Sequence, residues 1–413
     1  MSETVDDQQS IRVTRSSGLG RLLASTGVSL AGQGVVAAAA PLLAASLTSS
    51  PLAVASVTAA SYAASLLIGL PAGAMVDRWP RRSTMVIADL TRALTVAVLA
   101  LLVASGAASI GLLIAGVFLI AAAGCFFDPA AQAAIPVLVG REDRRTLTRA
   151  NGWLWALDVF GRSLVGPPVG AALFVLLAWL PFGLNALTFV VSAVLLTGVT
   201  ALKPPPVGDG STSSIRSDVA EGVRYLFGHR QLRALALGMS AYNLGYNIAY
   251  ATLVLYVTRT LGLRDVVFGI LLAALAIGGV FGGWLGPLVS RKWSALPIYA
   301  AALLVQAVSW GTLFVFPLVA TTGAALVVVG IASTTVSIAG GTARQTLTPD
   351  RLLGRVTAGT RVIGIGSAAL GALLGGAVAD LGGLTTPFIL AAAFLGACAL
   401  GFGLASRSRV VEP

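Results

Sequence analysis

Apolar stretches of about 20 residues alternate with short polar segments along almost the whole chain. An α-helix of about 20 residues crosses the hydrocarbon core of a bilayer, so each stretch has the length of one membrane span. The fifth and sixth stretches nearly fuse, as do the eleventh and twelfth, and turn-forming residues mark the breaks at 179–183 and 380–383. The pattern predicts twelve spans at residues 22–45, 53–75, 84–104, 109–127, 152–177, 182–201, 234–256, 266–288, 296–316, 320–342, 357–379 and 384–404.

The amino-acid composition indicates the fold class. Hydrophobic residues make up 56% of the 413 residues and charged residues only 10%, whereas soluble domains carry about 25% charged residues. A chain this long with so little charge buries most of its surface in lipid, so we expect an all-α membrane protein. The sequence has one histidine and two cysteines, both cysteines in apolar spans. This composition favours neither an enzyme nor a site for a metal or other cofactor.

The basic residues orient the chain in the membrane. Lysine and arginine together number 27, and the net charge is +11. If the N-terminus is cytoplasmic, the basic residues of the loops and tails all lie inside, except Arg259 and Arg264. Such a bias is typical of short cytoplasmic loops. It predicts a multi-pass protein of the cytoplasmic (inner) membrane with both termini in the cytoplasm, and it accounts for the basic charge without a nucleic-acid partner.

Short sequence motifs recur between the two halves of the chain. Residues 73–78 (GAMVDR) recur at 286–291 (GPLVSR), and residues 132–136 (QAAIP) recur at 345–349 (QTLTP), both with an offset of 213. Internal repeats of this kind are built into many transporter folds. The twelve predicted helices therefore divide into two pseudo-symmetric six-helix bundles, which we place at residues 1–201 and 232–413.

The predicted linker between the bundles, residues 202–231, has two parts. Its beginning is rich in proline, glycine and serine, as exposed linkers are. Residues 217–227 then carry apolar side chains at helical spacing behind Ser217, a residue type that caps helices. We interpret this second part as an amphipathic helix on the cytoplasmic surface. The alternative is that it simply begins the seventh span.

A charged segment joins the second and third predicted spans. Gly73 precedes Asp77 by one helical turn, and a cluster of arginines follows. Glycine lets another helix approach closely, and charges at the membrane surface can pair or cap a neighbouring helix end. We expect these residues to form a charged cluster at the cytoplasmic surface together with charges near the inner ends of the third and fourth spans. The residues of this cluster are Gly73, Asp77, Arg78, Arg81, Arg82, Asp89, Arg92 and Asp128.

This segment resembles the signature Gly-x-x-x-Asp-Arg-x-Gly-Arg-Arg/Lys of the major facilitator superfamily of secondary transporters. Five positions match in the expected slot, and Pro80 stands where the family usually has glycine. The resemblance implies alternating access, in which two bundles rock around a site near the membrane midplane and the charged cluster forms the cytoplasmic gate. The alternative to this family signature is a generic basic loop. For the charges near 89–92 and 128, the alternative to a gate is a purely structural ion pair.

The fifth span contains two charges that lipid alone cannot accommodate. Asp158 and Arg162 are four residues apart and therefore share one helix face. A charge at this depth is costly unless it is paired or faces water. We interpret Asp158 as a proton or cation site and Arg162 as its partner or as an anchor for an anionic substrate. The alternative is a permanently closed structural pair.

Just beyond this pair lies a segment of glycine and proline, Gly166-Pro167-Pro168-Val169-Gly170. Glycines admit a neighbouring helix, and prolines remove backbone hydrogen bonds. The segment resembles the Gly-Pro-x-x-Gly motif that exporters of the superfamily carry in helix 5, which implies an antiporter. Packing alone is the alternative explanation.

Polar stripes run along the first and seventh spans, which occupy equivalent places in the two halves. Polar side chains within a bilayer face the protein interior or a cavity. We therefore expect them to line a substrate cavity, with hydrogen bonds between helices as the alternative. The expected cavity residues are Ser29, Gln33, Asn243, Tyr246, Asn247 and Tyr250.

Within the superfamily, the chain is most similar to the enterobactin-exporter and macrolide-efflux branch, on residues 127–136, 150–151 and 166–167. Neutral Gln33 stands where several proton-driven exporters have an acidic residue, and the fourth span lacks the arginine that many carry. Proton coupling would therefore fall to Asp158.

The resemblance implies a monomeric secondary transporter that exports a small organic molecule, such as a drug, a siderophore or another secondary metabolite, by proton antiport. Uptake by the same fold is one alternative. A membrane sensor or scaffold that transports nothing is the other.

Overall fold

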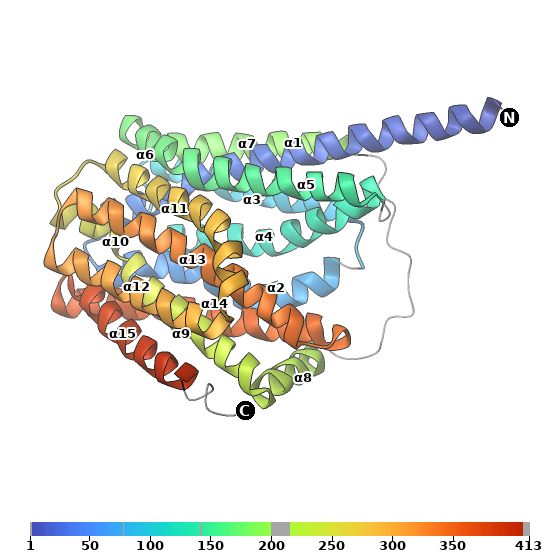
Figure 1. Cartoon of the computed structure of the whole chain (residues 1–413). Helices are drawn as coiled ribbons and strands as arrows, with labels where there is room; N and C mark the ends of the chain where they lie inside the picture. The colour runs from blue at the N-terminus through green and yellow to red at the C-terminus, as the bar shows by residue number, and fades with distance from the viewer. Residues whose placement is uncertain (1, 77, 141–142, 200–214, 408–413) are drawn as a thin grey trace. The chain divides into compact units, whose positions relative to one another are not determined.

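The computed structural model describes the backbone of residues 2–76, 78–140, 143–199 and 215–407, and the side chains of these residues apart from 2–17, 215–219, 350–351 and 405–407. Within these ranges the chain is helical and contains no strand (Figure 1). The elements are α1 Ser2–Leu47, α2 Pro51–Val76, α3 Arg81–Ala104, α4 Ile110–Val139, α5 Arg144–Leu157, the π-helical η1 Asp158–Val165, α6 Gly166–Leu176, α7 Leu180–Thr197, α8 Ile215–Gly228, α9 Arg230–Tyr250, α10 Leu253–Leu255, the π-helical η2 Tyr256–Thr260, α11 Asp265–Lys292, α12 Ala295–Val315, α13 Val319–Leu347, α14 Asp350–Gly382 and α15 Thr386–Arg407.

Eleven helices among the described residues are long and apolar enough to cross a membrane. One of them, Arg144–Leu176, runs continuously through α5, η1 and α6. The predicted seventh span corresponds to α9, which is 21 residues long but carries the polar stripe that lowers its hydropathy. Eleven apolar helices and one polar helix are consistent with the twelve predicted spans. The chain breaks between α6 and α7 at residues 177–179 and between α14 and α15 at residues 383–385, so each observed break overlaps the predicted one at a single residue.

The helices form two compact units by their internal contacts. Unit 1 comprises Met1–Ala39 and Leu67–Ser211, and unit 2 comprises Ala40–Leu66 and Thr212–Pro413. Ala40–Leu66, the end of α1 and the first part of α2, belong to unit 2 together with the C-terminal helices. Residues on both sides of the first loop thus contribute to unit 2.

In unit 1 the core lies where α3 packs on α4 and α7, around Met85, Phe127, Ile135 and Leu196. The π-helical η1 and the start of α6 pack directly on α1. A side-chain carbon added to Gly166 would clash with the backbone of Gly34. One added to Gly170 would overlap the carbonyl of Val35. The predicted exporter segment is therefore a site of backbone-to-backbone helix contact.

In unit 2, glycines packed against backbone likewise bring α11 and α13 together. A Cβ on Gly278 would meet the carbonyl of Val327, and one on Gly330 would meet the carbonyl of Leu275. Aromatic rings fill the space between α12, η2 and α15, where Phe388 stacks on Trp310 with ring centroids 6.0 Å apart. Small residues thus set the closest helix spacing, and aromatic rings fill the wider gaps.

The linker helix α8 is separate from α9. The ring of His229 caps α9 by accepting a hydrogen bond from the amide of Leu232 (3.4 Å). Glu221 pairs with Arg355 of α14, and Leu226 packs in a small core with Val356. The structure therefore has a distinct helix here, held against α14, in place of an extended start to the seventh span.

A pair of glycines on one span tests the packing at Gly170. We expect Gly170→Ala to destabilise the protein by about 1–3 kcal/mol, because the added methyl group overlaps backbone that cannot move away. Gly152 of α5 is exposed, with nothing within 4 Å of an added Cβ. Gly152→Ala should be neutral or stabilising, because alanine favours the helix. Thermal unfolding in detergent measures both variants. Equal melting temperatures for the two would contradict the close contact.

Candidate functional site

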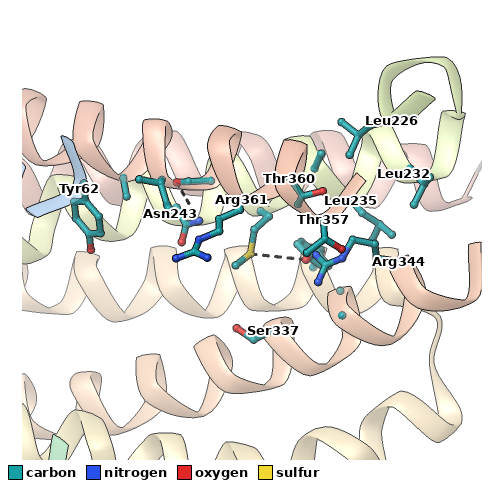
Figure 2. Close-up of a pocket in the computed structure, with 18 residues that line it drawn as sticks. Tyr62, Leu226, Leu232, Leu235, Asn243, Ser337, Arg344, Thr357, Thr360 and Arg361 are labelled. Carbon is teal, nitrogen blue, oxygen red and sulfur yellow. Dashed lines mark hydrogen bonds between the residues drawn. The ribbon is translucent and has the colours of Figure 1, made fainter. Parts of the chain in front are cut away.

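A cavity of about 460 Å³ opens within unit 2 between α9, α13 and α14, with contributions from α2, α8 and α12 (Figure 2). It is mainly apolar, with a few polar groups converging on it, as small-molecule sites commonly are. The lining residues are Tyr62, Leu226, Leu232, Leu235, Ala236, Met239, Asn243, Tyr299, Ser337, Gly340, Gly341, Arg344, Thr357, Thr360, Arg361, Gly364, Ile365 and Ala368.

A second cavity of about 310 Å³ extends the first along α9 and shares Tyr62, Met239, Asn243 and Ser337 with it. Its further lining residues are Tyr242, Tyr246, Asn247, Leu275, Gly279, Gly330, Ser333 and Thr334. The two cavities together follow the polar stripe of α9.

The polar side chains of α9 are held by specific hydrogen bonds. Asn243 Nδ2 donates to the carbonyl of Gly364 (3.4 Å), and Asn247 Nδ2 donates to the carbonyl of Asn243 (2.9 Å). The Tyr246 ring stacks on Tyr250, with centroids 5.0 Å apart. Asn243, Tyr246 and Asn247 line the described cavities, whereas Tyr250 supports Tyr246 from behind.

The expected cavity residues of α1 lie in unit 1. Gln33 Nε2 donates to the hydroxyl of Ser29 (3.2 Å), and Ser29 is fully buried. Neither residue lines one of the cavities described above.

Several lining residues are absent from the sequence-based prediction. The clearest are two arginines, Arg344 from α13 and Arg361 from α14, whose side chains project into the cavity (Figure 2). Tyr62 reaches it from α2. Arg361 carried a usable signal, because a charge inside a predicted span faces a cavity or a partner. Arg344 carried none, because sequence position alone placed it among the cytoplasmic basic residues.

A charged cluster lies inside unit 1 between α3, α4 and α7. Asp89 is fully buried and accepts a hydrogen bond from the hydroxyl of Ser192 (2.6 Å). Arg92 is 2% exposed and lies 3.4 Å from Asp89 and 3.9 Å from Asp128. Its guanidinium also covers the Phe127 ring, 4.9 Å from the centroid. The structure thus brings together three of the expected gate residues.

The remaining gate residues lie around the loop between α2 and α3. Asp77 falls outside the described residues. Arg78 is exposed, Arg81 and Arg82 are partly exposed, and a Cβ on Gly73 would meet no described atom within 4 Å. Next to them the Trp79 ring stacks on Phe126 of α4, with centroids 5.9 Å apart.

Asp158 and Arg162 form an ion pair on η1, with 3.2 Å between carboxylate and guanidinium. Both side chains are nearly half exposed, at 46% and 47%. Neither lines the described cavities. The wide π-helical turn that carries them is frequent at functional sites in helices.

A second charged arrangement, within unit 2, holds the junction of α1 and α2. The Arg259 guanidinium donates to the carbonyls of Ala45 (2.8 Å), Thr48 (2.8 Å) and Ser49 (3.1 Å). Asp380 accepts from the hydroxyl of Ser50 (3.1 Å) and from the amide of Leu52 (3.3 Å).

A cation thus binds the carboxyl end of α1 and an anion binds the amino end of α2, which matches both helix dipoles. We call Arg259 and Asp380 the latch. Sequence reasoning gave neither residue a role, because the bonds join positions more than 200 residues apart.

A bundle of membrane-crossing helices around a mainly apolar cavity with a few polar groups is typical of membrane transporters. A model of the Major Facilitator Superfamily matches residues 22–364, and the chain belongs to this family. It is therefore a transporter and not an enzyme.

The chain is 28% identical over 372 residues to the multidrug efflux pump Tap of Mycolicibacterium fortuitum, covering 87% of this chain and 88% of that protein. Two solved structures share the fold. A bacterial homologue of the human lysosomal transporter Spinster superposes with a TM-score of 0.73 at 17% identity, covering 95% of this chain and 97% of that one. The nucleoside transporter NupG gives a TM-score of 0.70 at 12% identity, with coverage of 95% and 98%.

The buried cluster of unit 1 makes a stability prediction. Asp89→Leu leaves the buried Arg92 with only the exposed Asp128, 3.9 Å away, as a carboxylate partner, and should destabilise the protein by about 3–5 kcal/mol. The double variant Asp89→Leu with Arg92→Met should recover most of this loss, because an apolar pair replaces the ions. Asp128→Asn is the control and should change little, since Asp128 is 61% exposed. Thermal unfolding measures all three. An Asp89→Leu protein as stable as wild type would contradict the prediction.

Proposed function

We propose that this protein exports a small organic molecule across the cytoplasmic membrane, with both termini in the cytoplasm and one chain as the working unit. The cavity of unit 2 carries the proposal, because its apolar walls and few polar groups suit a small amphipathic molecule. The resemblance of the Gly166–Gly170 segment to exporters supports the outward direction. The identity to a multidrug efflux pump over most of the chain supports it as well.

Energy for export would come from protons moving inward. Asp158 is the proposed proton site, because its carboxylate is nearly half exposed on a membrane-spanning helix and is paired with Arg162. Arg162 would compete with the proton for this carboxylate. Protonation of Asp158 would release Arg162, and deprotonation would restore the ion pair. Each change alters the charge presented by η1, which packs on α1 through Gly34.

Alternating access requires a gate at each end of the transport path. The Asp77 segment and the buried cluster of Arg92 would form the cytoplasmic gate. The latch of Arg259 and Asp380 would form the opposite gate, because it ties the α1–α2 junction to the C-terminal helices through at least five hydrogen bonds. Opening toward the outside would break these bonds.

The coupling role of Asp158 predicts a separation between uphill and downhill transport. Asp158→Asn should abolish accumulation of substrate against its gradient and leave downhill flux largely intact, because the amide binds no proton. Asp158→Glu should retain part of the accumulation. Uptake of a fluorescent drug into inverted vesicles, with and without an imposed pH gradient, measures both. If Asp158→Asn still concentrates the drug normally, the ion pair is structural and coupling lies elsewhere.

The latch predicts a change in access to the cavity. In a background of Cys125→Ala and Cys398→Ala, Ser337→Cys places one thiol in the cavity. Arg259→Gln should raise labelling of this thiol by a membrane-impermeant maleimide from the periplasmic side, because a loss of about 1.4 kcal/mol shifts a two-state ratio tenfold. Arg264→Gln, the other outer arginine, is the control and should label as the parent. Equal labelling of both variants would remove the gate role.

A further inference from the structure

We propose that Arg344 and Arg361 form a subsite for the acidic group of the transported molecule, which is then an amphiphile with a carboxylate, sulfonate or phosphate on an apolar body. This inference deepens the proposed export function and rests on it, because it assumes that the bound molecule is transported. Binding at the subsite can be tested without transport.

The two arginines reach the same cavity from different helices and depths (Figure 2). Arg344 lies near the carboxyl end of α13, which stops at Leu347. Arg361 lies eleven residues beyond the start of α14, about 16 Å along the helix axis at 1.5 Å per residue. In Figure 2 Arg361 lies beside Asn243, and Arg344 lies beside Thr357. A molecule that enters from the end nearest Arg344 therefore meets one cation and then the other.

No described carboxylate neutralises these charges. None of the lining residues is acidic. Elsewhere in unit 2, Glu221 pairs with Arg355, and Asp380 binds the start of α2. Among the described side chains, Arg344 and Arg361 make neither an ion pair nor a hydrogen bond, and the buried Nε of Arg344 has no acceptor.

Unpaired cations within a membrane-spanning unit are expensive. Arg344 can lower this cost by extending toward the end of its helix, but Arg361 is eleven residues into α14 and has the cavity as its outlet. An anion supplied by a ligand would satisfy both groups. The planar guanidinium matches the paired oxygens of a carboxylate, sulfonate or phosphate through two parallel hydrogen bonds.

The rest of the cavity specifies the other part of the ligand. Leu235, Ala236, Met239 and Ile365 offer apolar surface, and Asn243 offers an amide next to Arg361. An acidic group joined to an apolar body matches both parts. The same cavity disfavours organic cations, because two guanidinium groups repel them and no described lining carboxylate attracts them.

A matched pair of probes tests the subsite in the purified protein. The anion 8-anilinonaphthalene-1-sulfonate and the neutral N-phenyl-1-naphthylamine share one aromatic skeleton and differ in the sulfonate. We expect Arg361→Gln to weaken binding of the anion about tenfold or more, because it removes a charged hydrogen bond, and to leave the neutral probe unchanged. Arg344→Gln should act in the same direction, and Arg361→Lys should retain most of the affinity.

The exposed Arg224 of α8 provides the control. Arg224→Gln removes the same charge outside the cavity and should bind both probes as wild type does. Melting temperatures identify any variant that fails to fold, and Arg361→Lys then carries the comparison through its retained charge. The proposal is overturned if Arg361→Gln binds the anion as tightly as wild type, or if it loses both probes equally while remaining folded.

The acidic group could belong to a soluble molecule or to a phospholipid, and nanodiscs separate these sources. In phosphatidylcholine discs the added probe supplies the anion, because the lipid headgroup carries no net charge. If phosphatidylglycerol weakens probe binding to wild type but not to Arg361→Gln, the lipid headgroup occupies the subsite. If it weakens neither, the subsite favours soluble anions. Both outcomes support an anion subsite that depends on arginine.

Transport of the two probes into inverted vesicles separates this inference from the proposed function. Transport of the neutral probe without arginine-dependent binding of the anion leaves export standing and overturns the subsite. Arginine-dependent binding of the anion without transport of either probe supports the subsite and counts against export.

Discussion

Hydrocarbon offers no partner to a charged or polar group, and the rest of this structure depends on that constraint. Each charge within a span must find its partner in the protein or face a cavity. In unit 1 the partner is internal: Arg92 lies between Asp89 and Asp128 and over the ring of Phe127. In unit 2 the outlet is a cavity, where Arg344 and Arg361 stand without a described carboxylate. Unit 1 thus pairs its buried arginine with carboxylates of the protein, whereas unit 2 places its two arginines in a cavity.

The same constraint explains how the helices pack. Lipid tails are as apolar as leucine, so burying apolar side chains does little to drive helices together in a membrane. Close van der Waals contact between helices stabilises their association instead. Glycines provide that contact where η1 and α6 meet α1, and again where α11 meets α13. Because backbone lies against backbone at Gly34 and Gly170, a shift of η1 cannot be absorbed by side chains alone. A change in the Asp158–Arg162 pair would therefore reach α1 directly.

Besides ion pairs and the cavity, helix ends also stabilise charged side chains in this structure. Arg259 and Asp380 use the unsatisfied carbonyls of α1 and the free amide end of α2, which need partners wherever water is scarce. The three Arg259 bonds and the Leu52 bond are made to the backbone, whereas Asp380 also binds the side-chain hydroxyl of Ser50. Of the residues at the α1–α2 junction, only Ser50 therefore contributes its side chain to these bonds.

The sequence by itself determined the class of protein, the spans, the family and the position of the charged loop, because each is written in local patterns of length, hydropathy and spacing. It also indicated that α9 turns a polar stripe inward, and Asn243, Tyr246 and Asn247 do line the cavities. Only the tertiary structure decided which polar groups share a space. Tyr62 of α2 lies far along the chain from Arg344 of α13 and Arg361 of α14, and Arg259 binds carbonyls more than 200 residues away. Local sequence patterns do not encode these contacts, because the contacts depend on how whole helices pack.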